Sequence, residues 1–163
     1  MTNSEKSESQ ELIELKERNK QYQNEIYELS TPIIPSIVPN TILVPLMGKL
    51  TSERLEHIQE KLVNNIHKQS ADTVLIDFTG ISSYGVEENM EYDFLMGQIH
   101  NLVDSLRLMG AETLFVGLSP KLVQKLVSSN VRGLTELNAH ATFRTGLQYL
   151  LDKKGLEIRE KTK

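Results

Sequence analysis

An acid and a hydroxyl stand where a short apolar segment of this chain gives way to a polar one. Asp77 closes the segment 73–77, and Thr79 and Gly80 follow it. Such a pair at a strand end is able to contact a nucleotide, a metal ion or another protein. More often it makes side-chain-to-backbone hydrogen bonds within a turn. A single glycine is weak evidence for a phosphate-binding loop. We therefore predict a partner-binding surface here, with a local turn as the alternative.

Further hydroxyls lie in the polar stretch over residues 80–92, which we expect to form a loop. Ser82 and Ser83 would be open to a protein kinase there and are candidate phosphoacceptors. Serine is also common in loops simply because it favours turns. Glu87 and Glu88 lie in the same stretch, where nothing would adapt them to acid–base catalysis.

The other residue types that bind metals or act as nucleophiles form no catalytic pattern. The chain has no cysteine, which excludes a disulfide framework, a thiolate metal site and a cysteine nucleophile. No serine lies in a nucleophile-elbow sequence. The histidines lack the spacing of metal ligands; they are His57, His67, His100 and His140. We therefore expect no enzymatic activity, no bound metal and no cofactor.

The overall composition narrows the kinds of partner. The chain has 163 residues, of which 39% are hydrophobic and 25% charged, and this is typical of a globular domain. Its net charge is −4, and lysine and arginine do not cluster with aromatic residues, which argues against nucleic acid. No apolar stretch is long enough to span a membrane, and residues 1–10 lack the apolar region of a secretory signal. We expect a cytoplasmic protein.

Residues 10–29 are expected to form a helical stalk, preceded by a disordered tail over 1–9 and ended by Thr31-Pro32. The stalk carries a heptad repeat whose a and d positions are Leu12, Leu15, Asn19, Tyr22, Ile26 and Leu29. One asparagine at an a position among apolar neighbours fixes the register of two-stranded parallel coiled coils. The pattern therefore predicts a homodimer. The alternative is an amphipathic helix that packs on its own domain.

From residue 30 to residue 153 short apolar segments alternate with amphipathic helices, and a charged tail follows over 154–163. This alternation predicts an α/β domain, with a mixed sheet of about four to five strands covered by about four helices. A helix opened by Ser119-Pro120 is expected to bury Leu122, Val123, Leu126 and Val127. The last helix is expected to bury Phe143, Leu147 and Leu150.

Five sequence fragments occur in the order found in one known family. They cover residues 29–35, 43–48, 75–80, 106–111 and 116–120. In this order they resemble the C-terminal STAS domain of the RsbR-type stressosome co-antagonists, which are related to anti-sigma factor antagonists. The resemblance implies dimerisation through an N-terminal domain and a helical linker, and assembly with a smaller STAS protein into a large cytoplasmic complex. It also implies binding of a switch kinase that phosphorylates STAS hydroxyls and controls a general stress response.

The chain departs from that family in three places. The sensor domain that usually precedes the linker is not seen, and the loop after Gly80 is longer, with an acidic insert around 87–91. The positions of the family's two phosphoacceptor threonines fall on Asp93 and Lys125. Neither residue accepts a phosphate from a Ser/Thr kinase. The resemblance therefore implies a subunit that is not phosphorylated at the usual places.

Both positions have a functional and a structural interpretation. A carboxylate at Asp93 is a partial mimic of phosphothreonine, with one negative charge against about 1.5 to 2 for the phosphate. Alternatively, Asp93 is a first-turn residue favoured by the helix dipole. Lys125 is either a lost second phosphosite or a solvated surface lysine. On the functional interpretation, the subunit sets the baseline kinase affinity of a mixed assembly.

Two functions from different classes remain open. The first is a signalling scaffold that binds a switch-type Ser/Thr kinase and other STAS proteins to regulate a stress-response sigma factor. The second is a small-molecule or nucleotide-binding regulatory module, whose 79–92 loop closes over a ligand. The partner-binding surface of the first comprises Asp77, Thr79, Gly80, Asp93 and Lys125.

Overall fold

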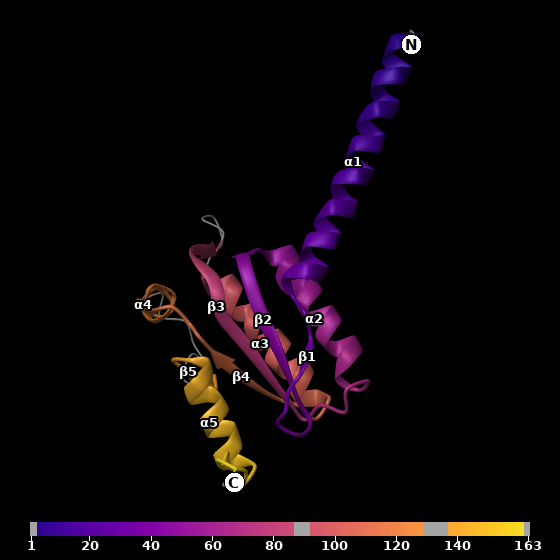
Figure 1. Ribbon diagram of the computed structural model, residues 1–163. Helices are drawn as coiled ribbons and strands as arrows, with labels where there is room; N and C mark the ends of the chain where they lie inside the picture. The colour runs from indigo at the N-terminus through magenta and orange to yellow at the C-terminus, as the bar shows by residue number, and fades with distance from the viewer. Residues whose placement is uncertain (1–2, 87–91, 129–136, 162–163) are drawn as a thin grey trace. The chain divides into compact units, whose positions relative to one another are not determined.

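The chain divides into two compact units, Met1–Ser30 and Thr31–Lys163, in the computed structural model (Figure 1). The structure describes residues 3–86, 92–128 and 137–161.

The first unit is one helix, α1, over Asn3–Ser30. It begins before residue 10, so the disorder expected over 1–9 is wrong for residues 3–9. Good helix formers such as Glu8 and Gln10, without glycine or proline, explain the longer helix. Within this one chain the apolar residues of the heptad repeat stay exposed, by 56–81%: Leu12, Leu15, Tyr22, Ile26 and Leu29. The stripe that the heptad predicts is therefore present and open.

The second unit is built on a five-stranded sheet in the order β1-β2-β3-β4-β5. The first pair is antiparallel and the other three are parallel, which confirms the predicted mixed α/β sheet. Parallel neighbours need crossover connections, and helices supply them between β2, β3 and β4. The strands are Ile34–Pro35, Thr41–Leu50, Thr73–Val86, Glu112–Val116 and Ala139–His140.

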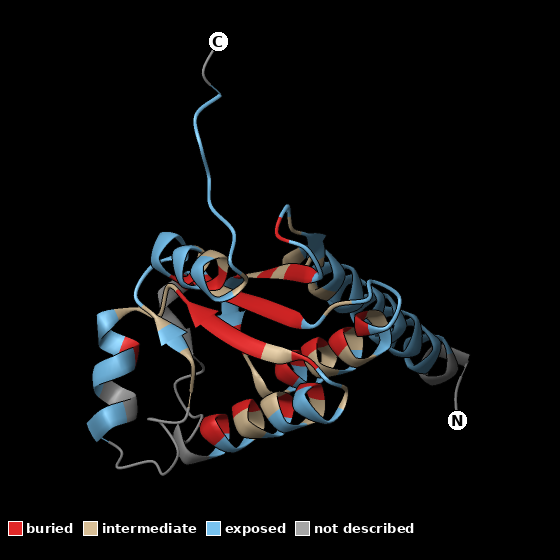
Figure 2. Cartoon of the chain, turned by 90° about the horizontal axis from the view of Figure 1, so that it is seen from below, coloured by how far each residue is buried: buried red, intermediate tan, exposed pale blue. Residues whose placement is uncertain are grey.

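Helices cover both faces of this sheet. The helices α2, Ser52–Ile66, and α3, Tyr92–Leu108, pack on one face. On the other face α5, Phe143–Lys153, packs Leu150 against Leu75, Leu114 and Val116. Figure 2 shows the buried residues along the strands and on the inner sides of these helices. Two apolar layers, one on each side of the sheet, therefore hold the strand ends in place.

Side-chain caps and a glycine fix the ends of these helices. Thr51 caps α2 by accepting a hydrogen bond from the backbone N–H of Arg54, and Thr142 caps α5 in a reciprocal pair with Thr145. The chain leaves α3 through Gly110, whose φ is 84°. Glycine tolerates this left-handed conformation without steric cost, so it is suited to end the helix.

Three local expectations are wrong. The strand β3 runs on to Val86, so residues 80–86 belong to a strand and not to the expected loop. Val123 and Val127 are 38% and 62% exposed and are not buried by their helix. Phe143, the first residue of α5, is 37% exposed and is not buried by its helix. Hydrophobic spacing indicates which residues share a helix face, but not whether another element covers that face.

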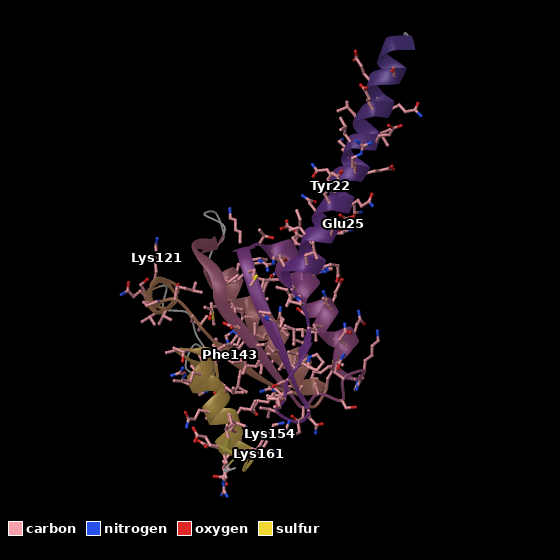
Figure 3. The ribbon with its side chains drawn as sticks, in the orientation of Figure 1. Tyr22, Glu25, Lys121, Phe143, Lys154 and Lys161 are labelled. Atoms are coloured by element: carbon pink, nitrogen blue, oxygen red, sulfur yellow. The ribbon has the colours of Figure 1, made fainter. Side chains whose placement is uncertain are left out.

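Lys154, the residue after α5, bonds to residues that precede the amino ends of β2 and β3 (Figure 3). Its ammonium group donates to Asp72 Oδ1 and to the Pro39 carbonyl, both at 2.7 Å. Burial by itself raises the pKa of the Asp72 carboxyl, but hydrogen bonds from Lys154 and Thr73 hold that pKa below its ordinary value. Lys154 thus belongs to the folded domain and not to the tail expected over 154–163.

The contact predicts a pH-dependent loss of stability for Lys154→Met. A carboxyl whose pKa is depressed by folding stabilises the protein above its unfolded pKa of about 3.9, and this stabilisation disappears as the pH falls through the folded value. The Asp72 side chain is 51% exposed, so the loss at pH 7 is expected to be only about 0.5–1 kcal/mol.

Urea unfolding at pH 7 and at about pH 2 measures this difference, which should nearly vanish at the lower pH. Arg107→Met is the control, because it removes an ion pair to Asp104 whose side chains are 77% and 58% exposed. An equal loss at both pH values would contradict the role of the Asp72 charge.

Candidate functional site

The site lies where the carboxyl ends of β3 and β4 meet. The last paired residues of the two strands are Asp77 and Val116. Beyond this pair β3 continues through Thr79, while β4 ends at Val116 and Gly117 follows it. Loops and helix starts at the carboxyl end of parallel strands are where α/β sheets usually bind their ligands and partners.

Asp77 fixes the conformation of the residues that follow it. Its Oδ1 atom accepts a hydrogen bond of 2.8 Å from the backbone N–H of Thr79. This is the local turn that the sequence offered as an alternative to a binding role. The carboxylate is thereby held beside Thr79, whose side chain is exposed at the same edge.

Gly117 closes this cluster from the side of β4. Its φ is 71°, in the region that favours glycine. A Cβ atom on Gly117 would lie 2.8 Å from both Asp77 Oδ1 and the Thr79 nitrogen, and closer still to Thr79 Oγ1. Backbone and side chains meet here without space for a side chain at residue 117. We refer to Asp77, Thr79 and Gly117 as the carboxyl-edge cluster.

Sequence reasoning found two members of this cluster and missed the third. Gly117 lies just after an apolar strand and just before a helix cap, and that position was the available signal. Gly80 also serves close packing, since a Cβ there would lie 2.5 Å from the Leu46 carbonyl oxygen on β2. Gly80 therefore has a structural role, whether or not it contacts a partner.

The helix α4, Pro120–Ser128, starts immediately after the cluster. The Ser119 hydroxyl accepts a hydrogen bond of 3.2 Å from the Leu122 backbone N–H, so Ser119 is the predicted cap. Leu122 packs into the core, while Val123 and Val127 face solvent. Lys121 lies in the first turn of the helix (Figure 3). The helix thus adds an exposed apolar strip to the same edge.

The two residues aligned with the family's phosphosites lie on the helices that follow β3 and β4. Asp93 is the second residue of α3, so a helix does begin where the sequence predicts one. Lys125 lies within α4. Their side chains are outside the described part of the chain. Their regulatory roles stay predictions.

Ser82 and Ser83 lie on β3, in a stretch with irregular pairing. From Asp77 to Val86 β3 advances nine residues, while β2 advances only five, from Pro45 to Leu50. The extra residues form bulges, which often occur beside functional sites. The acidic insert around 87–91 lies outside the described residues.

Two negative findings apply to the described residues. No group of histidines and acidic residues there has the arrangement of a metal site. None of the helices in that part of the chain has the length and apolar character needed to cross a membrane.

Comparison with known proteins finds relatives by sequence and by structure. No family model matches the chain. It is 32% identical over 133 residues to the RsbT co-antagonist protein RsbRA of Bacillus subtilis. The aligned region covers 82% of this chain and 45% of that protein. The chain thus spans about half the length of the curated relatives it matches.

Solved structures share the fold. A variant of the RsbS protein of Moorella thermoacetica matches with a TM-score of 0.57 at 17% identity, over 77% of this chain and 98% of that one. A chain from a structure entitled "Molecular architecture of the stressosome, a signal integration and transduction hub" matches with a TM-score of 0.55 at 16% identity. It covers 76% of this chain and 98% of that one. At these identities the match concerns the fold alone.

Proposed function

Since the chain carries a STAS domain of the RsbR type, we propose that it is a non-enzymatic scaffold subunit of a stressosome-like assembly. In this role it binds a switch-type Ser/Thr kinase and other STAS proteins in the cytoplasm and regulates a stress-response sigma factor. The observation that carries the proposal is the 133-residue match to an RsbT co-antagonist.

The carboxyl-edge cluster and α4 form the proposed kinase-binding surface. The cluster presents a carboxylate and a hydroxyl in a fixed arrangement, and α4 adds exposed Val123 and Val127. Polar groups held beside small apolar patches are what a transient protein interface needs. Gly80, Asp93 and Lys125 complete the proposed surface, because they belong to β3, α3 and α4 around the same edge.

We further propose that α1 joins two copies as a parallel coiled coil. Exposed apolar residues at the a and d positions leave a seam that a second copy is able to bury. Asn19 meets its own counterpart only in a parallel, in-register pair. In that register Glu11 and Lys16 occupy neighbouring g and e positions of opposite chains, and their charges attract. These features favour a parallel, in-register pair of two copies of this chain over an antiparallel pair.

Isolation of the tagged full chain from its native host tests the proposed function. Size-exclusion chromatography followed by mass spectrometry should find it in a particle far larger than a dimer, together with a smaller STAS protein and a Ser/Thr kinase. A dimer or monomer that carries neither protein would contradict the scaffold role.

Substitutions of Asp93 separate its two interpretations. If the carboxylate mimics a phosphate, Asp93→Asn should change kinase retention, and Asp93→Thr should create a new phosphoacceptor. If Asp93 only favours the helix start, Asp93→Asn should change almost nothing, because asparagine and aspartate cap helices equally well.

Kinase retention on a sensor chip and intact mass after incubation with kinase and ATP are the two measurements. Asp104→Asn is the matched control, since it removes one exposed carboxylate elsewhere on α3. Equal retention of Asp93→Asn and wild type would exclude the mimic.

A further inference from the structure

The chain folds back on itself at the end of α5. Gly155 has a φ of 66°, the left-handed conformation that often follows the last turn of a helix. Its N–H donates to the Asp152 carbonyl at 3.1 Å. The next N–H, of Leu156, donates to the Leu151 carbonyl at 2.9 Å. These bonds form a Schellman motif, which reverses the chain and brings the segment 156–158 beside α5.

A groove lies between this segment and the helix. Its volume is about 360 Å³, within the range of small-molecule sites, which is about 300–1,000 Å³. Two apolar side chains from each wall line what we call the α5 groove: Leu147, Leu151, Leu156 and Ile158. The first two are half-buried, because they also pack against the core layer under α5. The last two are exposed, so the fold leaves part of this apolar surface uncovered.

Free charges of opposite sign stand at two places along the α5 groove. Arg144 and Asp152 both line it, about two helical turns apart. Among the described residues, neither side chain forms a hydrogen bond or an ion pair. The third charged residue of the lining, Glu157, is paired with Arg159. An anionic group in the groove is therefore attracted to Arg144 and repelled from Asp152.

We propose that the α5 groove binds a small aliphatic carboxylate, with the carboxylate on Arg144 and the alkyl chain along the apolar side chains. A guanidinium group forms two parallel hydrogen bonds with a carboxylate, which fixes the orientation of the ligand. The alkyl chain removes Leu156 and Ile158 from water, and this burial supplies the affinity. The site shares no residue with the carboxyl-edge cluster and does not rest on the proposed function.

Isothermal titration calorimetry of the full chain with octanoate tests the proposal. We expect saturable binding of one octanoate per chain. Octanol has the same alkyl chain without the charge, so it should bind about five- to tenfold more weakly. Methyl NMR spectra should place the octanoate, because the methyl signals of Leu147, Leu156 and Ile158 should shift. Those of Leu55 and Ile58, in the other core layer, should not.

Two exposed residues allow the groove to be changed without disturbing the core. Arg144→Gln should weaken octanoate binding by about five- to tenfold and leave octanol binding unchanged, because only the carboxylate uses the guanidinium group. Ile158→Ser should weaken both ligands, because both use the apolar wall. Arg107→Gln is the matched control, since it removes an exposed arginine from α3 and should leave both affinities unchanged.

The outcomes separate the parts of the proposal. No saturable binding of octanoate at millimolar concentration overturns the site. Octanol affinity equal to that of octanoate, or equal losses in Arg144→Gln and Arg107→Gln, overturns the role of Arg144. Methyl shifts that appear only away from the α5 groove overturn its location.

Discussion

Replacing Gly117 by valine is expected to destabilise the STAS domain by about 2–5 kcal/mol. A left-handed conformation costs a residue with a Cβ about 1–2 kcal/mol, and overpacking adds about 1–3 kcal/mol. The Cβ would lie 2.8 Å from the Thr79 backbone nitrogen and from Asp77 Oδ1, so neither strand is able to yield without moving the other. Thermal unfolding should show a Tm lower by about 10 °C.

Two other glycines separate the cost of backbone strain from the cost of the close contact at residue 117. Gly155 has a φ of 66° and no atom within 4 Å of the place a Cβ would take, so Gly155→Ala measures the backbone strain alone. Gly97 lies in α3 with open space around it, so Gly97→Ala should stabilise the helix by about 0.5–1 kcal/mol. If Gly117→Val costs no more than Gly155→Ala, the close contact with Thr79 and Asp77 is not the cause.

Replacing Asn19 by isoleucine is expected to raise the thermal stability of the dimer and to loosen its oligomeric state. Burial of each isoleucine is worth about 1.5–3 kcal/mol, and two isoleucines replace one pair of asparagines per dimer. The loss of the paired asparagines also removes the feature that favours two chains over three or four. Analytical ultracentrifugation and thermal unfolding at several concentrations measure both effects.

Asn24→Ile is the matched control for this substitution. It makes the same chemical change at an f position, on the far side of the heptad from Asn19. It should leave the dimer mass and stability almost unchanged. A chain that starts at Thr31 should sediment as a monomer. A loss of stability in Asn19→Ile, or an unchanged mass after removal of α1, would show that α1 is not the dimer contact.

Local sequence signals predicted most of the helices and strands because their causes are local. Thr51 and Ser119 cap their helices through hydrogen bonds to residues three positions ahead. Leu55, Ile58 and Leu62 recur with helical spacing and are all buried. Such signals need only the residues within one or two turns of the chain.

The features that sequence reasoning missed depend on contacts between distant segments. The irregular end of β3 is fixed by its pairing with β2, which no pattern within β3 reveals. The need for glycine at residue 117 comes from Asp77 and Thr79, nearly forty residues earlier in the chain. The exposure of Val127 depends on which elements cover α4, and hydrophobic spacing does not indicate which elements these are. The carboxyl-edge cluster is thus a tertiary feature built from unremarkable residues.

The bulges of β3 also bear on where the strand is able to change in length. Between Asp77 and Val86 the strand takes up four more residues than β2, yet the register from Thr73 to Asp77 stays regular with both neighbouring strands. We therefore expect a change of length in the irregular part of β3 to disturb the regular pairing of 73–77 little. An experimenter is thus free to insert a short epitope or fluorophore-binding tag between Ile81 and Val86 to report on partner engagement.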